Sequence, residues 1–276
     1  MAVLIEDYAL LGNCRTAALV ARDGSLDWLC FPRFDAPACF SALLGDSDNG
    51  RWKIAPVDAQ CQTVRRYRDG TLILETSFTT ETGRALLLDF MPMDVDSSVV
   101  RLVIGLEGRV DFSMDLAIRF DYGSTVPWVE KREPHTMTAV AGPEMLVLRT
   151  PAELHPMDHH TESCFTVEAG QRLGFALGWQ ASHEPVREAF DIEQALENFK
   201  RVPTAEADIQ ITPARAVDAK PGESDVVIKW NQRFPARVSL SVDNSGSKTT
   251  GKYQGNVALS LDNALSLNTP FSATFN

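Results

Sequence analysis

Residues Asp111–Asp121 read DFSMDLAIRFD, and this stretch decides the fold class. Phe112, Met114, Leu116, Ile118 and Phe120 alternate in it with polar or small residues. Successive side chains of a β-strand point to opposite faces, so a period of two places one face in a core and the other in water. The stretch therefore predicts a strand that covers a hydrophobic core on one side only.

Turn dipeptides surround this strand on both sides at short intervals, and short apolar runs lie between them. Strands of this length with regular turn signals are typical of a β-sandwich. The turns are Asp23-Gly24, Asn49-Gly50, Asp69-Gly70, Thr82-Gly83, Glu107-Gly108, Ala141-Gly142 and Ala169-Gly170. The predicted strands are Leu72–Phe78, Ala85–Phe90, Val99–Leu106, Asp111–Asp121, Met145–Arg149, Cys164–Val167 and Leu173–Trp179. We therefore predict a mainly β fold, an antiparallel β-sandwich over residues 1–190.

Composition limits the classes of function. The chain has 276 residues, 44% of them hydrophobic, and a net charge of −11, which disfavours a nucleic-acid partner. No run approaches the roughly 20 apolar residues of a spanning helix, and the first residues carry acid where a signal peptide carries Lys or Arg. The five cysteines are odd in number and form no CxxC pair, which is the usage of a reducing compartment. We expect a cytoplasmic protein with no metal and no cofactor.

The pattern changes near residue 190. Residues 188–201 place Phe190, Ala195, Leu196 and Phe199 at helical spacing and stop before Val202-Pro203, which predicts a helix of that span. Two strands are expected next, at 207–211 and 225–230, joined by a turn at 220–223. The resulting domains are 1–190, a helix-strand-strand piece over 191–235, and a β-hairpin over 236–276.

The hairpin alternates an aliphatic face with a hydroxyl or acidic face. Val238, Leu240 and Val242 lie on its first strand, and Val257 and Leu259 on its second, after a loop at 244–252. A membrane barrel strand and a soluble strand on a core both show this alternation. The residues alone leave the two interpretations open.

One segment has the composition of a sugar site. Residues 22–35 form a hairpin turn followed by aromatic side chains that alternate with Asp27, Arg33 and Asp35. Pyranose rings present apolar CH faces and hydroxyl edges, which match Trp28 and its charged neighbours. The candidate carbohydrate-contact residues are therefore Asp27, Trp28, Arg33 and Asp35. The alternative interpretation is a core strand with a buried ion pair.

Other motifs support no chemistry. HPMDHH at 155–160 would resemble a metal-binding motif on a helix, but the surrounding pattern favours a solvated turn between strands. Glycosidases need two carboxylates that flank the scissile bond, and the many acids here, Asp89 among them, single out no pair. Phosphate-loop, dinucleotide, nucleophile-elbow and zinc-protease motifs are missing from the sequence.

Residues 5–20, continued by DGSLDWLCFPRFDAPACFSALLG up to Gly45, resemble the amino-terminal domain of glycoside hydrolase family fifteen, which contains bacterial glucoamylase-like and trehalase-like hydrolases. Further matches are Arg66-Tyr67, Leu74–Thr76, Asp89–Pro92 and WQASHEP at 179–185. The resemblance implies a β-sandwich that precedes an (α/α)6 catalytic barrel, with α-linked glucose substrates and two catalytic glutamates in the barrel. No barrel motif can be placed on this chain, so we predict no catalytic residue. A glucan or disaccharide ligand and a catalytic barrel are the implied partners.

Residues 191–211 resemble the end of the second POTRA domain of two-partner-secretion transporters of the haemolysin-activator type. Pro221–Asp225 fits the same domain, and residues 243–263 resemble the first hairpin of the transporter barrel. This resemblance raises the barrel-strand interpretation of residues 238–261 above the soluble one. Two strands cannot close a barrel, so no membrane insertion is expected of the truncated hairpin.

The two resemblances describe a chimera with a seam near residues 189–196. Three hypotheses remain open for its function. The chain is an accessory, non-catalytic carbohydrate-hydrolase domain with a passive tail, or a transport module that binds an extended polypeptide by strand addition. In the third hypothesis the fusion has no selected function, and its unpaired strands favour aggregation.

Overall fold

The structure is a computed structural model, and it describes residues 4–93, 97–133, 135–200, 205–213, 224–232, 236–243, 254–261 and 271–275. It is mainly β and antiparallel, as the sequence predicts. One compact unit contains the strands up to residue 181 and the following helix, and the strands after residue 235 belong to a second unit. The predicted turns at 220–223 and 244–252 lie outside the described residues.

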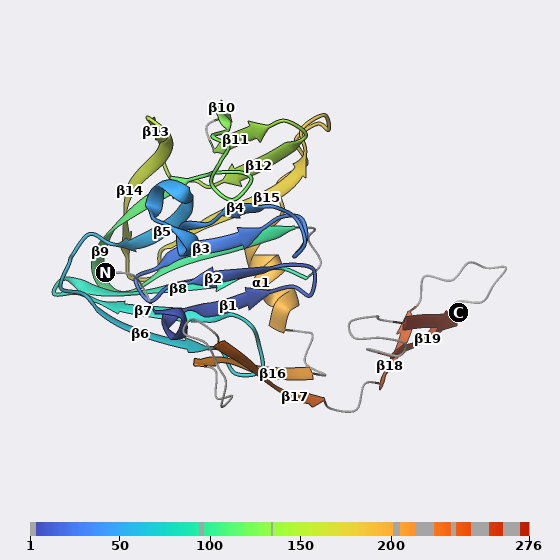
Figure 1. Ribbon diagram of the computed structural model, residues 1–276. Coiled ribbons are helices and arrows are strands. Elements are labelled where there is room, and N and C mark those ends of the chain that lie inside the picture. The colour runs from blue at the N-terminus through green and yellow to red at the C-terminus, as the bar shows by residue number, and fades with distance from the viewer. Residues whose placement is uncertain are drawn as a thin grey trace. The chain divides into compact units, whose positions relative to one another are not determined.

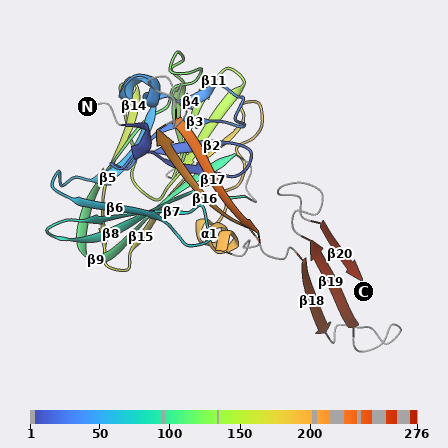
Figure 2. The ribbon, with the colours of Figure 1, turned by 60° about the horizontal axis from the view of Figure 1, so that its bottom comes forward.

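The first unit is built from two sheets that share one long strand (Figures 1 and 2). The first sheet has the order β1-β2-β3-β5-β9-β14-β13, with β4 on β3, and the second has the order β6-β7-β8-β9-β15-β12-β11-β10. The strands are β1 (Ala9–Gly12), β2 (Ala17–Val20), β3 (Ser25–Cys30), β4 (Ala38–Phe40), β5 (Arg51–Pro56), β6 (Gln62–Tyr67), β7 (Leu74–Thr79), β8 (Gly83–Phe90), β9 (Ser98–Ala117), β10 (Trp128–Glu133), β11 (Thr136–Ala141), β12 (Glu144–Arg149), β13 (His155–Met157), β14 (His160–Glu168) and β15 (Arg172–Ala181). Short 3-10 helices occupy Ile5–Asp7 (η1), Ala42–Leu44 (η2) and Ser47–Asn49 (η3).

Strand β9 joins the two sheets because it bends at Gly108. Its first half pairs with β8 and β15, and its second half pairs with β5 and β14. Gly108 has a φ of +60°, and a Cβ there would lie 2.2 Å from the Thr82 carbonyl oxygen. The sequence predicted two strands separated by a turn at Glu107-Gly108. That prediction was wrong. The glycine bends a single 20-residue strand and does not close a hairpin.

The core lies between the two sheets. The ring of Trp52 on β5 lies 6.4 Å from that of Phe175 on β15, and Phe112 on β9 lies 5.9 Å from Phe78 on β7. The five apolar residues of the opening stretch are all at most 6% exposed. The alternation identifies the inward face of β9 up to Leu116, as predicted. The strand ends at Ala117 and not at Asp121, and Ala117 and Arg119, which were expected to face water, are buried.

Helix α1 (Ile192–Lys200) packs on the outer face of the second sheet. Its Ala195 and Leu196 contact a cluster that includes Leu102 and Ala176, and Glu193 forms an ion pair with Arg172 at 2.7 Å. The helix is shorter than the predicted span of 188–201. It begins at Ile192 because the Asp191 carboxylate accepts a hydrogen bond from the Glu193 backbone N–H at 2.9 Å, as a helix N-cap does.

The remaining strands form two small sheets. The strands are β16 (Ala205–Pro213), β17 (Ser224–Gln232), β18 (Ala236–Asp243), β19 (Gln254–Leu261) and β20 (Phe271–Phe275). The first two pair with each other, and the last three form an antiparallel sheet with β19 in the centre (Figure 2). The hairpin was predicted over 236–276. Strands β18 and β19 form it, with Ala236 opposite Leu261, and β20 adds a third strand that the sequence did not predict.

Candidate functional site

Two of the four predicted carbohydrate-contact residues face solvent together after strand β3. Arg33 donates from Nε and Nη2 to the two carboxylate oxygens of Asp35, at 2.9 and 3.0 Å. Both side chains are 71% exposed. The hydrogen bonds from Arg33 lower the pKa of the Asp35 carboxyl, so the pair presents a fixed anion beside a fixed cation.

This pair lines a hollow of about 800 Å³, which we call the Arg33 hollow. Phe34 offers an aromatic face that is 64% exposed, and the indole of Trp179 is held by a 3.0 Å hydrogen bond from its Nε1 to the Glu144 carboxylate. Aromatic faces beside charged groups are suited to a sugar ring. The lining residues are Cys14, Arg15, Pro32, Arg33, Phe34, Asp35, Ser97, Trp179 and Arg187.

The other two predicted residues lie elsewhere. Asp27 is buried and accepts hydrogen bonds from the hydroxyls of Tyr8, at 2.7 Å, and Ser25. Burial, and then the bond to Asp27, raise the pKa of Tyr8. Trp28 points to the opposite face of β3, where its ring centre lies 6.2 Å from that of Tyr122. The structure thus brings Arg33 and Asp35 together, and separates both of them from Asp27 and Trp28.

The remaining lining residues come from distant parts of the sequence. Cys14 follows β1, Ser97 precedes β9, and Trp179 lies on β15. Sequence reasoning did not assign Trp179 or Arg187 to a site. The one sequence signal at Trp179 was the WQASHEP motif. That motif predicted the end of the domain but did not indicate which residues lie near Trp179 in the fold.

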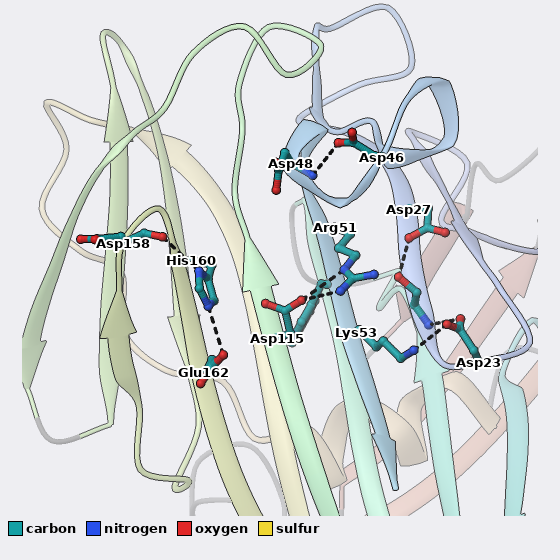
Figure 3. Close-up of polar contacts among 12 residues, drawn as sticks. Asp23, Asp27, Asp46, Asp48, Arg51, Lys53, Asp115, Asp158, His160 and Glu162 are labelled. Carbon is teal, nitrogen blue, oxygen red and sulfur yellow. Dashed lines mark hydrogen bonds and ion pairs between the residues drawn. The ribbon is translucent and has the colours of Figure 1, made fainter. Parts of the chain in front are cut away.

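A row of charged side chains covers the outer face of the first sheet (Figure 3). Lys53 pairs with Asp23 at 2.7 Å, and Arg51 pairs with Asp115 at 2.7 Å. Further along, the ring of His160 bonds to the Glu162 carboxylate at 3.1 Å. These pairs are partly exposed, which limits their individual contribution to stability.

A second hollow, of about 460 Å³, opens on this face, and we call it the Arg119 hollow. Asp115 and Glu162 are cross-strand partners on β9 and β14, so their side chains stand side by side on one sheet face. Glycoside hydrolysis needs acids that flank a bond from two sides. Asp115 and Glu162 stand on one sheet face and therefore cannot flank a glycosidic bond from two sides. The lining residues are Ser47, Asp48, Asp115, Ala117, Arg119, Val126, Asp158, His159, His160 and Glu162.

His160 is held in a setting that favours its protonated form. Its Nε2 faces the Glu162 carboxylate and its Nδ1 faces the Asp158 carbonyl oxygen at 3.0 Å, so a protonated ring can donate to both. The bond to Glu162 is the main cause of a raised pKa, and the charge of Asp115 adds to it. A raised folded-state pKa stabilises the fold below the unfolded value of about 6.5, and this contribution is lost as the pH rises through the folded pKa.

The variant Glu162→Gln is expected to lower the pKa of His160, because the amide keeps a hydrogen bond but removes the charge. NMR titration of the histidine ring protons measures this. The stability difference between wild type and variant should be larger at pH 5–6 than at pH 8. The titration curves of the other histidines serve as the internal control, and an unchanged His160 curve would contradict the assignment.

The HPMDHH stretch and Asp89, which the sequence analysis also considered, belong to the scaffold of the fold. The HPMDHH stretch forms the β13–β14 hairpin, and among the described residues no group of three or more His, Cys, Asp or Glu is arranged to hold a metal ion. Asp89, one of the many acids of the sequence, is fully buried against Arg101 at 2.8 Å. No described helix is long and apolar enough to cross a membrane.

Comparisons with known proteins divide the chain in the same way as the two sequence resemblances. A family model described as "Trehalase-like, N-terminal" matches residues 1–166. A model described as "POTRA domain" matches residues 189–213, and one described as "Haemolysin secretion/activation protein ShlB/FhaC/HecB" matches residues 222–276. Both resemblances are thereby confirmed.

The individual relatives follow the same division. A trehalase of Mycolicibacterium smegmatis is 34% identical over 138 residues, which cover 43% of this chain and 20% of that protein. A trehalase of Thermoplasma volcanium is 35% identical over 138 residues, 46% of this chain and 22% of that protein. The outer membrane transporter CdiB-2 of Burkholderia pseudomallei is 48% identical over 86 residues, 31% of this chain and 14% of that protein. The chain therefore spans about a fifth of the length of these trehalases.

Proposed function

Because this chain belongs to the trehalase-like N-terminal family, we propose that residues 1–190 are a non-catalytic domain that contacts α-linked glucose sugars. The composition of the Arg33 hollow carries this proposal. Asp35 is the one carboxylate among the lining residues that the structure describes, and Arg33 holds both of its oxygens. Such a hollow can bind hydroxyl groups, and its described lining offers no second acid of the kind that glycosidic cleavage needs.

The chemistry of its surface supports sugar binding at the Arg33 hollow. The exposed ring of Phe34 can lie against the apolar face of a pyranose. Arg33 can donate to sugar oxygens and Asp35 can accept from sugar hydroxyls, and the charge on each strengthens these hydrogen bonds. A volume of about 800 Å³ falls in the range of small-molecule sites and is large enough for a disaccharide.

The purified chain is expected to hydrolyse neither trehalose nor maltose. Glucose release, followed by a coupled assay across pH 4–8, measures this. Turnover that copurifies with the chain, and that persists when the protein is expressed in a host without its own trehalase, would overturn the non-catalytic assignment.

The double variant Arg33→Ala/Asp35→Ala is expected to weaken trehalose binding at least tenfold, since it removes two charged hydrogen-bonding groups of about 1.5–3 kcal/mol each. NMR titration of the full chain measures the affinity. The matched control is Arg132→Ala/Glu130→Ala, an exposed pair with the same spacing and an Nε–Oε2 distance of 3.1 Å. Equal effects of the two double variants would argue against a site at this hollow.

A second candidate function rests on the 48% identity to CdiB-2. We infer that residues 191–276, if exported, bind an extended polypeptide by adding it as a strand to an open sheet edge. Cell fractionation separates the two proposals, because a transport role requires the chain to leave the cytosol. A purely cytosolic chain would exclude this second role and leave the first one standing.

A further inference from the structure

The outer face of the second sheet is apolar on three neighbouring strands, β8, β9 and β15. Its side chains form a hydrophobic cluster that is separate from the core between the sheets. They are cross-strand partners and therefore stand side by side. A sheet face turned to water usually carries polar residues, so this face requires a cover. We call it the outer apolar strip, and its residues are Leu86, Leu88, Phe90, Val100, Leu102, Ile104, Gly174 and Ala176.

Helix α1 covers this strip with the face that carries Ile192, Ala195 and Leu196. Ala195 and Leu196 are at most 5% exposed, and Ile192, one turn earlier, packs against the same cluster. Residues three and four positions apart share one face of a helix. A helix of nine residues is only marginally stable in water by itself, so α1 depends on this packing.

The strip and the helix also match in shape and charge. Gly174 leaves a notch for Ile192, because a Cβ at residue 174 would lie 2.6 Å from the Ile192 Cδ1. A larger residue there would have to push Ile192 aside. Beside the notch, Arg172 donates from Nε and Nη2 to the two carboxylate oxygens of Glu193, at 2.7 and 2.8 Å. Such a two-bond pair fixes the position of the helix along the strand.

The segment between β15 and α1 is fixed to the sandwich as well. The side-chain amide of the buried Gln180 donates to the Pro185 carbonyl oxygen at 2.9 Å, and its oxygen accepts from the Arg187 backbone N–H at 3.1 Å. The direction in which the chain enters the helix is thus set before residue 190. The POTRA family model begins at residue 189, so a segment of transporter type covers a sheet of the trehalase-like part.

We propose that the outer apolar strip is a docking site for an amphipathic helix and that α1 is its occupant. The site recognises an aliphatic side chain for the Gly174 notch, an acid beside it for Arg172, and two small or aliphatic residues three and four positions further on. The folding unit then ends near residue 200, beyond the boundary between the two families. A protein that binds the apolar face of α1 has to displace the helix from the sheet. This inference does not depend on sugar binding at the Arg33 hollow.

Hydrogen exchange on the full chain tests the docking of α1. The amides of residues 196–198 should exchange at least about a hundredfold more slowly than in an unfolded chain, since an undocked helix of this length opens readily. Leu196→Asp places a charge against the strip and should bring their exchange to within about fivefold of the unfolded rate. The matched control is Gln194→Asp, which adds the same residue on the exposed face of the helix and should leave the protection unchanged.

Gly174→Val tests the notch from the side of the strand. Valine suits a strand but occupies the space of Ile192, so the protection of α1 should fall at least about tenfold. Adding Ile192→Ala to that variant should recover part of the protection, because the smaller side chain leaves room for the valine. Circular dichroism verifies that the sheet is intact in both. Protection that falls further in the double variant would contradict the contact between residues 174 and 192.

A labelled peptide of residues 188–201 tests the strip as a site for a separate helix. Fluorescence anisotropy should show binding to the Leu196→Asp chain at least about tenfold tighter than to the wild-type chain, whose strip is already occupied. The same peptide carrying Leu196→Asp is the control and should not bind.

Four results would overturn the docking site. They are unprotected α1 amides in the wild type, equal loss of protection in Leu196→Asp and Gln194→Asp, no binding of the peptide to the Leu196→Asp chain, and self-association of that chain that the peptide does not reverse. The last result would make a second copy of the chain the occupant in place of α1.

Discussion

Asp89→Asn is expected to lower the free energy of unfolding by about 3–5 kcal/mol, because it leaves the charge of Arg101 buried without a counterion. Arg101 and Asp89 are both fully buried and joined by two hydrogen bonds of 2.8 and 3.2 Å. The same guanidinium donates to the backbone carbonyl oxygens of Trp52 at 2.5 Å and Gly24 at 2.7 Å. These bonds connect β8 and β9 of the second sheet to the first sheet, so the loss affects the contact between the layers.

Urea denaturation of the wild type and the variant measures this difference. The chain provides a matched control in Glu107→Gln, since Arg84 and Glu107 form another β8–β9 cross-strand ion pair, at 2.9 Å, but with both side chains at least half exposed. We expect that control to cost less than about 1 kcal/mol. Similar losses for the two variants would show that burial does not set the contribution of the Asp89–Arg101 pair.

The single variant Phe112→Ala is expected to lower the free energy of unfolding by about 3–5 kcal/mol, because it opens a cavity between the sheets. Phe112 is fully buried, and its ring stacks on Phe165 at 5.5 Å and meets the edge of Phe78 at 5.9 Å. Two aromatic contacts are lost in addition to the buried area.

The neighbouring substitution Ser113→Ala is the control, since Ser113 points to solvent on the same strand. It should change stability by less than about 0.5 kcal/mol. Phe112→Leu should lose less than the alanine variant because it fills more of the cavity. Thermal unfolding followed by circular dichroism gives all three values, and equal losses at positions 112 and 113 would contradict the inward orientation of Phe112.

The local pattern of the sequence was informative because alternation is a property of neighbouring residues. The apolar members of 111–116 are the ones that face the core, whereas beyond the end of the strand at Ala117 the alternation of burial is lost. The mainly β antiparallel class follows from the turn signals around them. The helix after residue 190 was also predicted, although its start depended on the Asp191 cap. Both family resemblances rest on contiguous motifs, which is why they could be identified without a structure.

Other features depend on contacts between residues that are far apart in the chain. Gly108 was interpreted as a hairpin turn because its dipeptide carries that signal, whereas the pairing partners of β9 on both sides keep the strand continuous. Asp27 and Trp28 belong to the same predicted cluster as Arg33, but the pleat of β3 and the turn after it send them to different places.

The sequence by itself determined the fold class, the inward face of the strands and the two families that meet near residue 190, because periodicity and motifs are local. Only the tertiary structure decided that Trp179 joins Arg33 at one hollow, that Asp89 neutralises Arg101, and that Arg119 lies buried beside Asp48. These groups meet through long-range strand pairing, and the partner of a strand is selected by the whole sheet and not by the residues of that strand.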